Sequence, residues 1–372
     1  MTSRRAYRSD LSDARWALIE PVLSAWRAER ADAGLGLSEP GHDLREIVNA
    51  IFYVNRTGIA WEYLPHDFPP YKTVYDYYAK WEKDGTTQAI HDLLRGKARE
   101  QAGRAAEPTA AIIDAQAVKA SSNVAEASQG YDAGKRTKGR KRHIAVDTLG
   151  LLLALVITAA SVQDTNGGKD VVTELAARHP AVTAGWVDGG YKKGFLEHAA
   201  ATGITFEVVQ KQEGQKGFAV LPRRWVVERT FGWLVLHRRL VRDYETLPER
   251  SETMIYWALI DNMSRRLTGE TTQTWRDTPA KPDTPSPVKI RRPLRSAHSS
   301  SRSKTSAGFP TTSPTSSTMV ILSVVELDIS GGAVLRWLGA SSVALFRSAR
   351  PRSVDRPPSR LPGRQVQTQA GQ

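Results

Sequence analysis

Three acidic residues stand in sequence settings that suit metal-dependent chemistry. Asp114 closes the apolar run AAII, Asp188 lies between GWV and GGY, and Glu228 lies in LPRRWVVERTFGWL. A carboxylate in a buried strand is costly unless it has a partner, and a cation would be that partner. We therefore take Asp114, Asp188 and Glu228 as the candidate catalytic residues and metal ligands.

The surroundings of Asp188 and Glu228 strengthen this interpretation. The two glycines after Asp188 let a backbone or a ligand approach the carboxylate closely. Pro222 suits the first turn of a helix that carries Glu228. Its packed face is formed by Val227, Phe231 and Leu234. Glu228 therefore points off that face, with Arg224 one turn before it and Gly232 one turn after it.

Carboxylates from two strands and a helix suit oxygen-seeking ions, Mg²⁺ or Mn²⁺, better than zinc. Two such ions about 3.5 to 4 Å apart activate water or a 3′-hydroxyl and stabilise the leaving oxygen of an in-line displacement. The predicted chemistry is thus on a phosphodiester, with two ions per site and no small-molecule cofactor. For any one acidic residue alone, a salt bridge or a helix cap is the alternative, and only their joint settings favour the metal site.

Two groups of basic residues indicate contacts with nucleic acid. The segment GKRTKGRKRH leads into a strand and predicts a phosphate-contacting loop. Its basic residues are Lys135, Arg136, Lys138, Arg140, Lys141 and Arg142. The helix of Glu228 carries a second set, in which the predicted contacts are Arg224, Arg229, Arg238 and Arg239. A solvated surface run is the alternative for the first group.

Four further polar residues are weaker candidates for the site. His143 could act as a base or a metal ligand, but a lone histidine among basic neighbours more often contacts phosphate or backbone. Asp132, Asp147 and Asp164 are rival carboxylates, for which we expect turn or hairpin roles.

Net charge alone says little about the partner. The chain of 372 residues carries a formal charge of +13, but residues 271–372 hold 15 basic and 5 acidic side chains, so the first 270 have a net charge of only +3. The prediction of a nucleic-acid partner therefore rests on the local basic clusters.

The elements that position these residues form two predicted regions. Residues 1–105 read as a small all-α domain of four helices. The first has Ser12 or Asp13 as its N-cap, the second starts near Asp43 and is broken by Gly58, the third runs through Tyr75, Tyr78 and Trp81, and the fourth starts near Thr86. The third helix could enter a DNA major groove through Lys72, Thr73, Tyr77 and Lys80, or its tyrosines could be core. Residues 106–270 alternate short apolar strands with helices, which predicts an α/β fold with a mixed sheet flanked by helices. The helix of Glu228 is expected to run from about 222 to 241.

The composition of the C-terminal residues, and the residue types that the sequence lacks, predict a tail and a compartment. Residues 271–372 are rich in Ser, Thr, Pro and Arg, so we expect a largely disordered tail. The chain has no cysteine, no signal-peptide pattern and no apolar run of about 20 residues. We expect a cytoplasmic, nucleoid-associated protein without a membrane segment.

The motifs together resemble the DDE class of insertion-sequence transposases. The likeness rests on IIDAQAVK, GYDAGKRTKGRKRHIAVDTLG, WVDGGY and LPRRWVVERTFGWL, in that order. The N-terminal segments LSDARWALIEPVL and NAIFYVNRTGIAWEYLPHDFPP resemble the accessory helical domain of one subgroup. The resemblance covers about residues 7–267 and implies a ribonuclease-H-like catalytic fold. It also implies that Asp114, Asp188 and Glu228 are the acidic triad.

By the same resemblance, the partners are double-stranded DNA, both element ends and target, and further copies of the chain on that DNA. Related transposases often have a tyrosine three residues before the arginine of the last motif and a lysine seven after the glutamate. In this chain Leu221 and Val235 occupy those two positions.

Two alternative functions stay open: a catalytically inactive DNA-binding remnant, and a stand-alone nuclease of the same fold.

The tail gives a first prediction. Subgroup members usually stop near SETMIYWALIDNMSRRL, whereas this chain continues for about a hundred residues of different composition. We expect this tail to be a read-through or frame-shifted extension, so that deleting residues 272–372 leaves DNA cleavage intact. A nicking assay on the truncated protein tests this, and loss of cleavage by a soluble, folded truncation would contradict it.

Overall fold

The computed structural model describes residues 4–34, 41–209 and 224–271. Residues 272–372 of the predicted tail lie outside the described residues, as do Leu221 and Pro222. Within them no helix has both the length and the apolar character that crossing a membrane requires.

The N-terminal region consists of four α-helices, as predicted. They are α1 (Asp13–Asp32), α2 (Leu44–Thr57), α3 (Tyr71–Lys83) and α4 (Thr86–Gln101), with a short 3₁₀ turn, η1 (Trp61–Tyr63). Of the two predicted N-caps of the first helix, Ser12 is the one observed, and its side chain accepts from the amide of Arg15. Asp43 caps α2 by accepting from the amide of Arg45. Gly58 ends α2 in the left-handed conformation, with φ of 76°, which glycine adopts without strain.

The aromatic side chains of α3 pack inside the protein. Tyr77, Tyr78 and Trp81 are buried, and Lys80 pairs with Asp76 on the same helix. The packing interpretation of this helix therefore fits the structure better than entry into a major groove through Tyr77.

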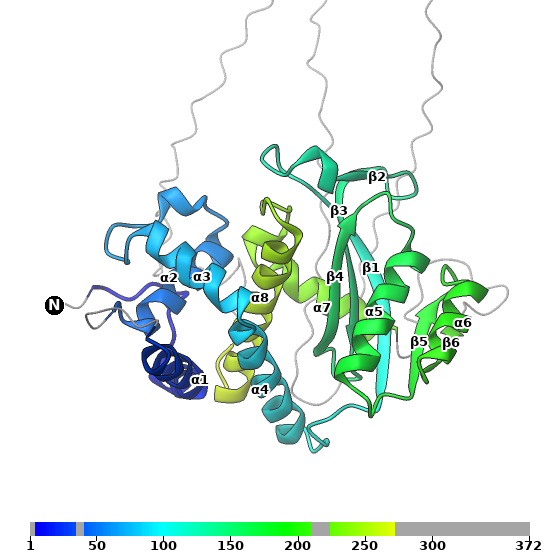
Figure 1. The fold of residues 1–372 in the computed structure, drawn as a ribbon, viewed down its shortest axis with the longest axis horizontal. Helices are drawn as coiled ribbons and strands as arrows, with labels where there is room; N and C mark the ends of the chain where they lie inside the picture. Colours follow the sequence, from blue (N-terminus) through cyan, green and yellow to red (C-terminus); the bar gives the residue numbers. More distant parts are fainter. Residues whose placement is uncertain (1–3, 35–40, 210–223, 272–372) are drawn as a thin grey trace, which may run out of the picture. The chain divides into compact units, whose positions relative to one another are not determined.

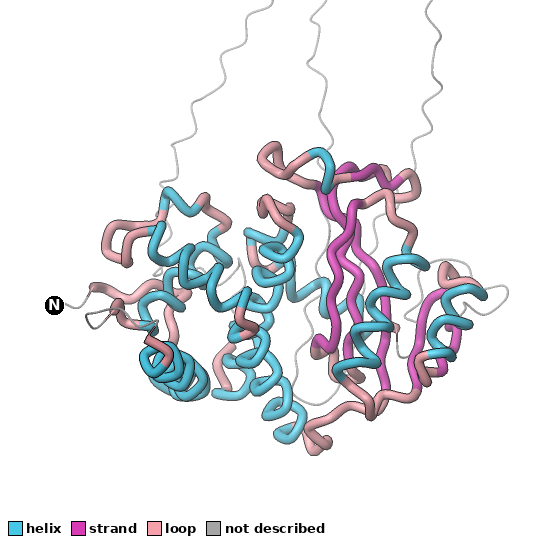
Figure 2. Tube along the Cα trace, viewed as in Figure 1, coloured by secondary structure: helices cyan, strands magenta, loops and turns pink. Residues whose placement is uncertain are grey.

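The remaining chain forms a mixed sheet of six strands with helices on both faces (Figure 2). Its strands are β1 (Ala110–Lys119), β2 (Gly130–Asp132), β3 (Thr137–Val146), β4 (Leu152–Ala159), β5 (Ala184–Asp188) and β6 (Thr205–Val209). Its helices are η2 (Glu126–Ser128), α5 (Asp164–Arg178), α6 (Lys193–Ala201), α7 (Trp225–Val235), η3 (Arg238–Leu240) and α8 (Pro248–Thr268). The strand order is β2-β3-β1-β5-β6, and β4 also pairs with β3. The predicted α/β class with a mixed sheet is confirmed.

The sheet combines two kinds of pairing. Strand β3 is antiparallel to β1, β2 and β4, whereas β1, β5 and β6 are parallel to one another. Figure 1 shows α5 lying along the strands and α6 beside β5 and β6, and these helices bury one apolar cluster on that face. The other face is contacted by α7 and α8.

Helix α8 connects the sheet to the N-terminal helices. It contacts β4 on one side and α1, α2, α3 and α4 on the other, and one apolar core includes residues from all of these elements. The predicted division at residues 105 and 106 into a helical and a catalytic domain stays a prediction.

One predicted boundary is wrong. The helix of Glu228 ends at Val235 rather than near residue 241, and η3 follows it. The apolar and basic residues beyond Val235 fit a continued helix by composition, but Leu240 and Arg239 are instead buried in the short 3₁₀ turn.

Candidate active site

The pairing of β1 with β5 explains why two of the candidate carboxylates meet. These strands are parallel, with Ile112 beside Trp186 in register. Two residues further along each strand stand Asp114 and Asp188, and side chains two residues apart share a face of a sheet. Strand β5 ends at Asp188, so both carboxylates lie where the pairing stops.

Helix α7 brings Glu228 to the same face. It contacts β1 and β3, and its buried residues include the predicted Val227, Phe231 and Leu234. The Glu228 side chain points off that packed face and is 48% exposed. The predicted orientation of Glu228 is confirmed.

A single guanidinium joins the three carboxylates. The Nη2 atom of Arg224 lies 3.4 Å from Asp114 Oδ2, 3.8 Å from Asp188 Oδ2 and 3.6 Å from Glu228 Oε1. Arg224 is the residue that precedes α7 and is itself largely buried, with 14% of its side chain exposed. The structure therefore gathers all three predicted site carboxylates around one positive charge.

Backbone amides orient the two aspartates. The amide of Ala115 donates to Asp114 Oδ1 at 2.7 Å, and the amide of Gly190 donates to Asp188 Oδ1 at 2.8 Å. In each residue the other oxygen, Oδ2, is the one that faces Arg224. One oxygen is thus held by the backbone while the second is presented to the common centre.

Burial makes Asp114 the most perturbed carboxylate of the three. Burial, together with the nearby Asp188, raises the pKa of Asp114, the Ala115 amide, Arg224 and Lys135 oppose the rise, and the net pKa is about 6 instead of 3.8. Only 17% of this side chain is exposed, against 34% for Asp188. The site therefore holds a carboxylate whose negative charge is incompletely compensated.

The donor set suits a divalent ion, but the observed arrangement is not a finished metal site. All three side chains offer oxygen ligands, and a costly buried charge at Asp114 would be relieved by a cation. In the part of the chain that the structure describes, no three His, Asp or Glu side chains are gathered closely enough to hold a metal ion as they stand. Arg224 lies among them, so it must move for an ion to take its place.

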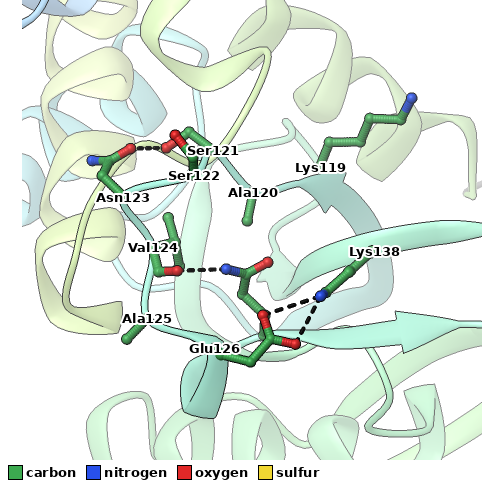
Figure 3. Close-up of a pocket in the computed structure, with 10 residues that line it drawn as sticks. Lys119, Ala120, Ser121, Ser122, Asn123, Val124, Ala125, Glu126 and Lys138 are labelled. Atoms are coloured by element: carbon green, nitrogen blue, oxygen red, sulfur yellow. Dashed lines mark hydrogen bonds and ion pairs between the residues drawn. The ribbon is translucent and has the colours of Figure 1, made fainter.

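The basic segment divides into exposed and buried residues. Lys135 and Arg136 are exposed in the turn between β2 and β3, and the Lys135 Nζ donates to the carbonyl of Ala115 at 2.9 Å, next to Asp114. Lys138 is exposed but pairs with Glu126 at 2.7 Å. That pair borders an open pocket of about 560 Å³ lined by Lys119, Ser121 and Asn123 among others (Figure 3). Lys119 stands five residues along β1 from Asp114, about 16 Å away, so this pocket is separate from the carboxylates.

Three residues of the basic segment are not available to DNA, which corrects the prediction of one phosphate-contacting loop. Arg140, Lys141 and Arg142 are 0 to 4% exposed because β3 begins at Thr137 and both of its faces are covered. Each of the three side chains has a polar partner within the protein. Arg140 Nη1 donates to the Glu245 carbonyl at 2.7 Å, Lys141 Nζ pairs with Asp164 at 2.8 Å, and Arg142 Nη1 donates to the Gln116 side chain at 3.4 Å. Burial also lowers the pKa of Arg142 to about 10.

The basic residues near Glu228 also divide. Arg239 is buried, with its Nε 2.7 Å from Glu245, so it too is corrected as a predicted DNA contact. Arg229 is half-buried between two tryptophan rings, 4.4 Å from the centre of Trp225 and 4.8 Å from that of Trp233. Arg238 is exposed.

The weaker candidates have structural roles. His143 is buried on the face that α5 covers, with Nε2 2.9 Å from the Thr158 hydroxyl, and burial lowers its pKa to about 4. Asp147 accepts from the amides of Leu149 and Leu151, which closes the hairpin between β3 and β4. The expected turn role of Asp147 is confirmed.

One residue beside the carboxylates was not singled out from the sequence. Tyr191 follows Asp188 by three residues, and its buried ring lies against α5. The signal that could have found it is the pair of glycines in DTNGGKD, because adjacent glycines inside a helix mark a close approach by other groups.

Comparisons with known families agree with this geometry. Residues 11–91 match the family described as "Putative transposase of IS4/5 family", and residues 105–262 match the family described as "Transposase DDE domain". No curated protein matches the chain. The sheet order, the carboxylates at its centre and the second match define a DDE transposase with a ribonuclease-H-like fold. With the N-terminal match added, the chain belongs to the insertion-sequence transposases of the DDE class.

Proposed function

We propose that this chain cuts DNA at the ends of an insertion element and joins those ends to target DNA, in a reaction that depends on Mg²⁺ or Mn²⁺. The observation that carries the proposal is the convergence of Asp114, Asp188 and Glu228 on one cation, Arg224. Three carboxylates of different burial, held on two strands and a helix, suit phosphodiester chemistry at a shared centre.

In this proposal Asp114, Asp188 and Glu228 hold two divalent ions. Such ions, when bound, activate the attacking water or 3′-hydroxyl and stabilise the leaving oxygen. The protein contributes orientation: the amides of Ala115 and Gly190 fix one oxygen of each aspartate and leave the other for the site. Glu228 is the most exposed of the three and can adjust its position on the surface of α7.

Arg224 has two roles in this account. Without a bound ion it compensates part of the charge of the three carboxylates. If divalent ions compensate the charge of the carboxylates instead, the Arg224 guanidinium no longer has to pair with them. A planar guanidinium binds phosphate oxygens well. Arg224 then serves as a contact for the DNA backbone next to the reacting phosphodiester.

The proposed DNA surface contains basic residues that are exposed or partly buried, and it excludes the buried Arg140, Lys141, Arg142 and Arg239. It consists of Lys135, Arg136, Lys138, Arg224, Arg229 and Arg238. Lys135 contributes to the field at Asp114, which links this surface to the carboxylates. We further propose that the protein acts on DNA as a homo-oligomer, as the resemblance to its family implies.

Replacing Arg136 with Gln tests the surface. Arg136 is exposed in the β2–β3 turn, so the variant should bind all DNA sequences more weakly and lower the slope of log affinity against log salt by about 1. Fluorescence anisotropy over a salt series measures this. Lys193→Gln on α6, where the side chain is 89% exposed, is the matched control and should keep the wild-type slope. An unchanged slope in Arg136→Gln would exclude this residue from the DNA surface.

The function itself is tested by incubating the protein with labelled element-end DNA, a target plasmid and Mg²⁺. We expect cleaved ends that become covalently joined to the plasmid. Cleavage without joining would instead indicate a stand-alone nuclease. Binding with neither cleavage nor joining would indicate an inactive remnant, and either result would contradict the proposal.

A further inference from the structure

Strand β1 has one edge that its neighbour β5 covers only in part. It pairs with β3 from Ile112 to Lys119, whereas its pairing with β5 runs only from Ala110 to Ile112. The N–H and C=O groups of one strand residue point to the same edge of the strand. The Ala115 amide donates to the Asp114 side chain at 2.7 Å, so the Asp114 carboxylate lies at the edge to which the Ala115 N–H and C=O groups point.

Lys135 reaches the same edge from the turn between β2 and β3. Its Nζ donates to the Ala115 carbonyl at 2.9 Å, so the ammonium and the Asp114 carboxylate are bound to the two polar groups of one residue. The Lys135 amide donates to Asp132 Oδ1 at 2.9 Å, which holds the turn. The Lys135 charge also lowers the pKa of Asp114. The ammonium therefore lies beside the carboxylates.

The Lys135 ammonium is accessible and has donors to spare. Its side chain is 44% exposed, and Asp164 Oδ2, at 3.7 Å, is beyond hydrogen-bond distance. Asp164 is paired more closely with the buried Lys141, at 2.8 Å. An ammonium carries three N–H donors, and within the described part of the chain the Ala115 carbonyl takes one of them. Two N–H groups thus remain for an acceptor that arrives from solvent.

From this placement we propose that Lys135 is a further catalytic residue, whose ammonium donates to a non-bridging oxygen of the scissile phosphodiester. The inference rests on the proposed function, because it requires DNA at the three carboxylates. Those carboxylates repel a phosphate, and a cation at the edge of β1 offsets part of that repulsion. A donor that the Ala115 carbonyl already holds in place needs little reorganisation when negative charge builds up on the phosphate oxygens.

The first test compares Lys135→Gln, which removes the charge, with Lys135→Arg, which keeps it. At pH 8 and saturating DNA, the single-turnover cleavage rate of Lys135→Gln should fall about 100-fold, the scale of losing one donor to the developing charge. Lys135→Arg should recover most of this loss, because a guanidinium also binds phosphate oxygens. Both variants should melt close to the wild-type temperature, since the side chain is exposed.

The second test uses DNA in which a methyl group replaces one non-bridging oxygen of the scissile phosphate. This linkage is neutral and lacks one acceptor. In one of its two stereoisomers Lys135→Gln and wild type should cleave at equal rates, because the mutation and the methyl group remove the same contact. Metal-free fluorescence anisotropy gives a readout independent of cleavage. There Lys135→Gln should bind ordinary DNA more weakly than wild type, and the two proteins should bind this stereoisomer with equal affinity.

Lys193→Gln is the matched control. It also removes an exposed lysine, whose side chain is 89% exposed, but from α6, which contacts α5 and β6. This control should cleave and bind both DNAs as wild type does.

Three results would overturn the inference. The first is equal cleavage of ordinary DNA by Lys135→Gln and wild type. The second is a loss in Lys135→Gln that is as large on both stereoisomers as on ordinary DNA, which would limit Lys135 to positioning the Ala115 carbonyl. The third is a Lys135→Gln protein that does not fold. A wild-type protein that cleaves no DNA would instead refute the proposed function.

Discussion

Replacing Asp114 with Asn should give a protein that is more stable than wild type at pH 8 and cleaves DNA at least about 100-fold more slowly, the scale of losing one preorganised contact to the transition state. The stability gain follows from the pKa of Asp114, which burial raises to about 6 in the folded protein from an ordinary 3.8. Holding this group ionised costs at most about 3 kcal/mol, and the neutral amide avoids that cost.

The pH dependence has a defined sign. A carboxyl whose folded pKa is raised stabilises the fold below its unfolded pKa, and this contribution is lost as pH rises through the folded value. Thermal melts of the metal-free proteins should therefore show the full advantage of Asp114→Asn at pH 8, most of it near pH 6, about half near pH 5 and little near pH 4. Added Mg²⁺ should stabilise wild type more than the variant.

Asp147→Asn is the matched control for this prediction. Asp147 is also buried, but it is paired with Arg99 and accepts two backbone hydrogen bonds. Its replacement should lower stability at pH 8 rather than raise it. If Asp114→Asn proved less stable than wild type at pH 8, the account of Asp114 as an incompletely compensated charge would be wrong.

A second large effect, a loss of folding stability, is expected on mutation of a buried cluster of charged residues between α1 and α8. Asp261 is fully buried, with Oδ1 2.5 Å from Arg15 Nη2 and 3.1 Å from Arg265 Nε. Burial raises the pKa of Asp261, but the charges of Arg15, Arg265 and His237 outweigh it and lower the pKa overall. Asp261→Asn leaves two buried cations without their anion and should cost about 3 to 5 kcal/mol.

Urea denaturation at pH 7 measures this effect. Arg15→Met is the informative companion, because it leaves Asp261 paired with Arg265 and should cost less than Asp261→Asn. Since the folded pKa of Asp261 is lowered, its contribution is present at neutral pH and is lost as pH falls below 3.8 and through the folded value. A cost below about 1 kcal/mol for Asp261→Asn would show that this cluster does not hold α1 to α8.

Much of the framework could be predicted because it depends on local pattern. Ser12 caps one helix and Gly58 ends another where the sequence indicated. Asp114 and Asp188 lie on strands read from short apolar runs, and the helical period set the side of α7 from which Glu228 projects. These features follow from residues close in the chain.

The errors concern burial, which depends on residues far apart in the chain. The segment from Lys138 to Arg142 reads as an exposed, phosphate-contacting loop because strongly charged strands buried on both faces are rare. The anions that make burial possible here are Asp243, paired with Arg140, and Asp164, paired with Lys141. The sequence does not single out Tyr191 for a similar reason, since the place of its ring depends on Gly168 in α5.

The central claim is that the carboxylates around Arg224 perform metal-dependent chemistry on DNA. It is tested most directly by Mg²⁺-dependent nicking and joining of labelled element-end DNA, with wild type compared with Asp188→Ala. We expect nicked and joined products from wild type in Mg²⁺, none without it, and none from Asp188→Ala although that variant folds and binds DNA. Equal products from Asp188→Ala and wild type, or no product from folded, DNA-bound wild type, would contradict the account.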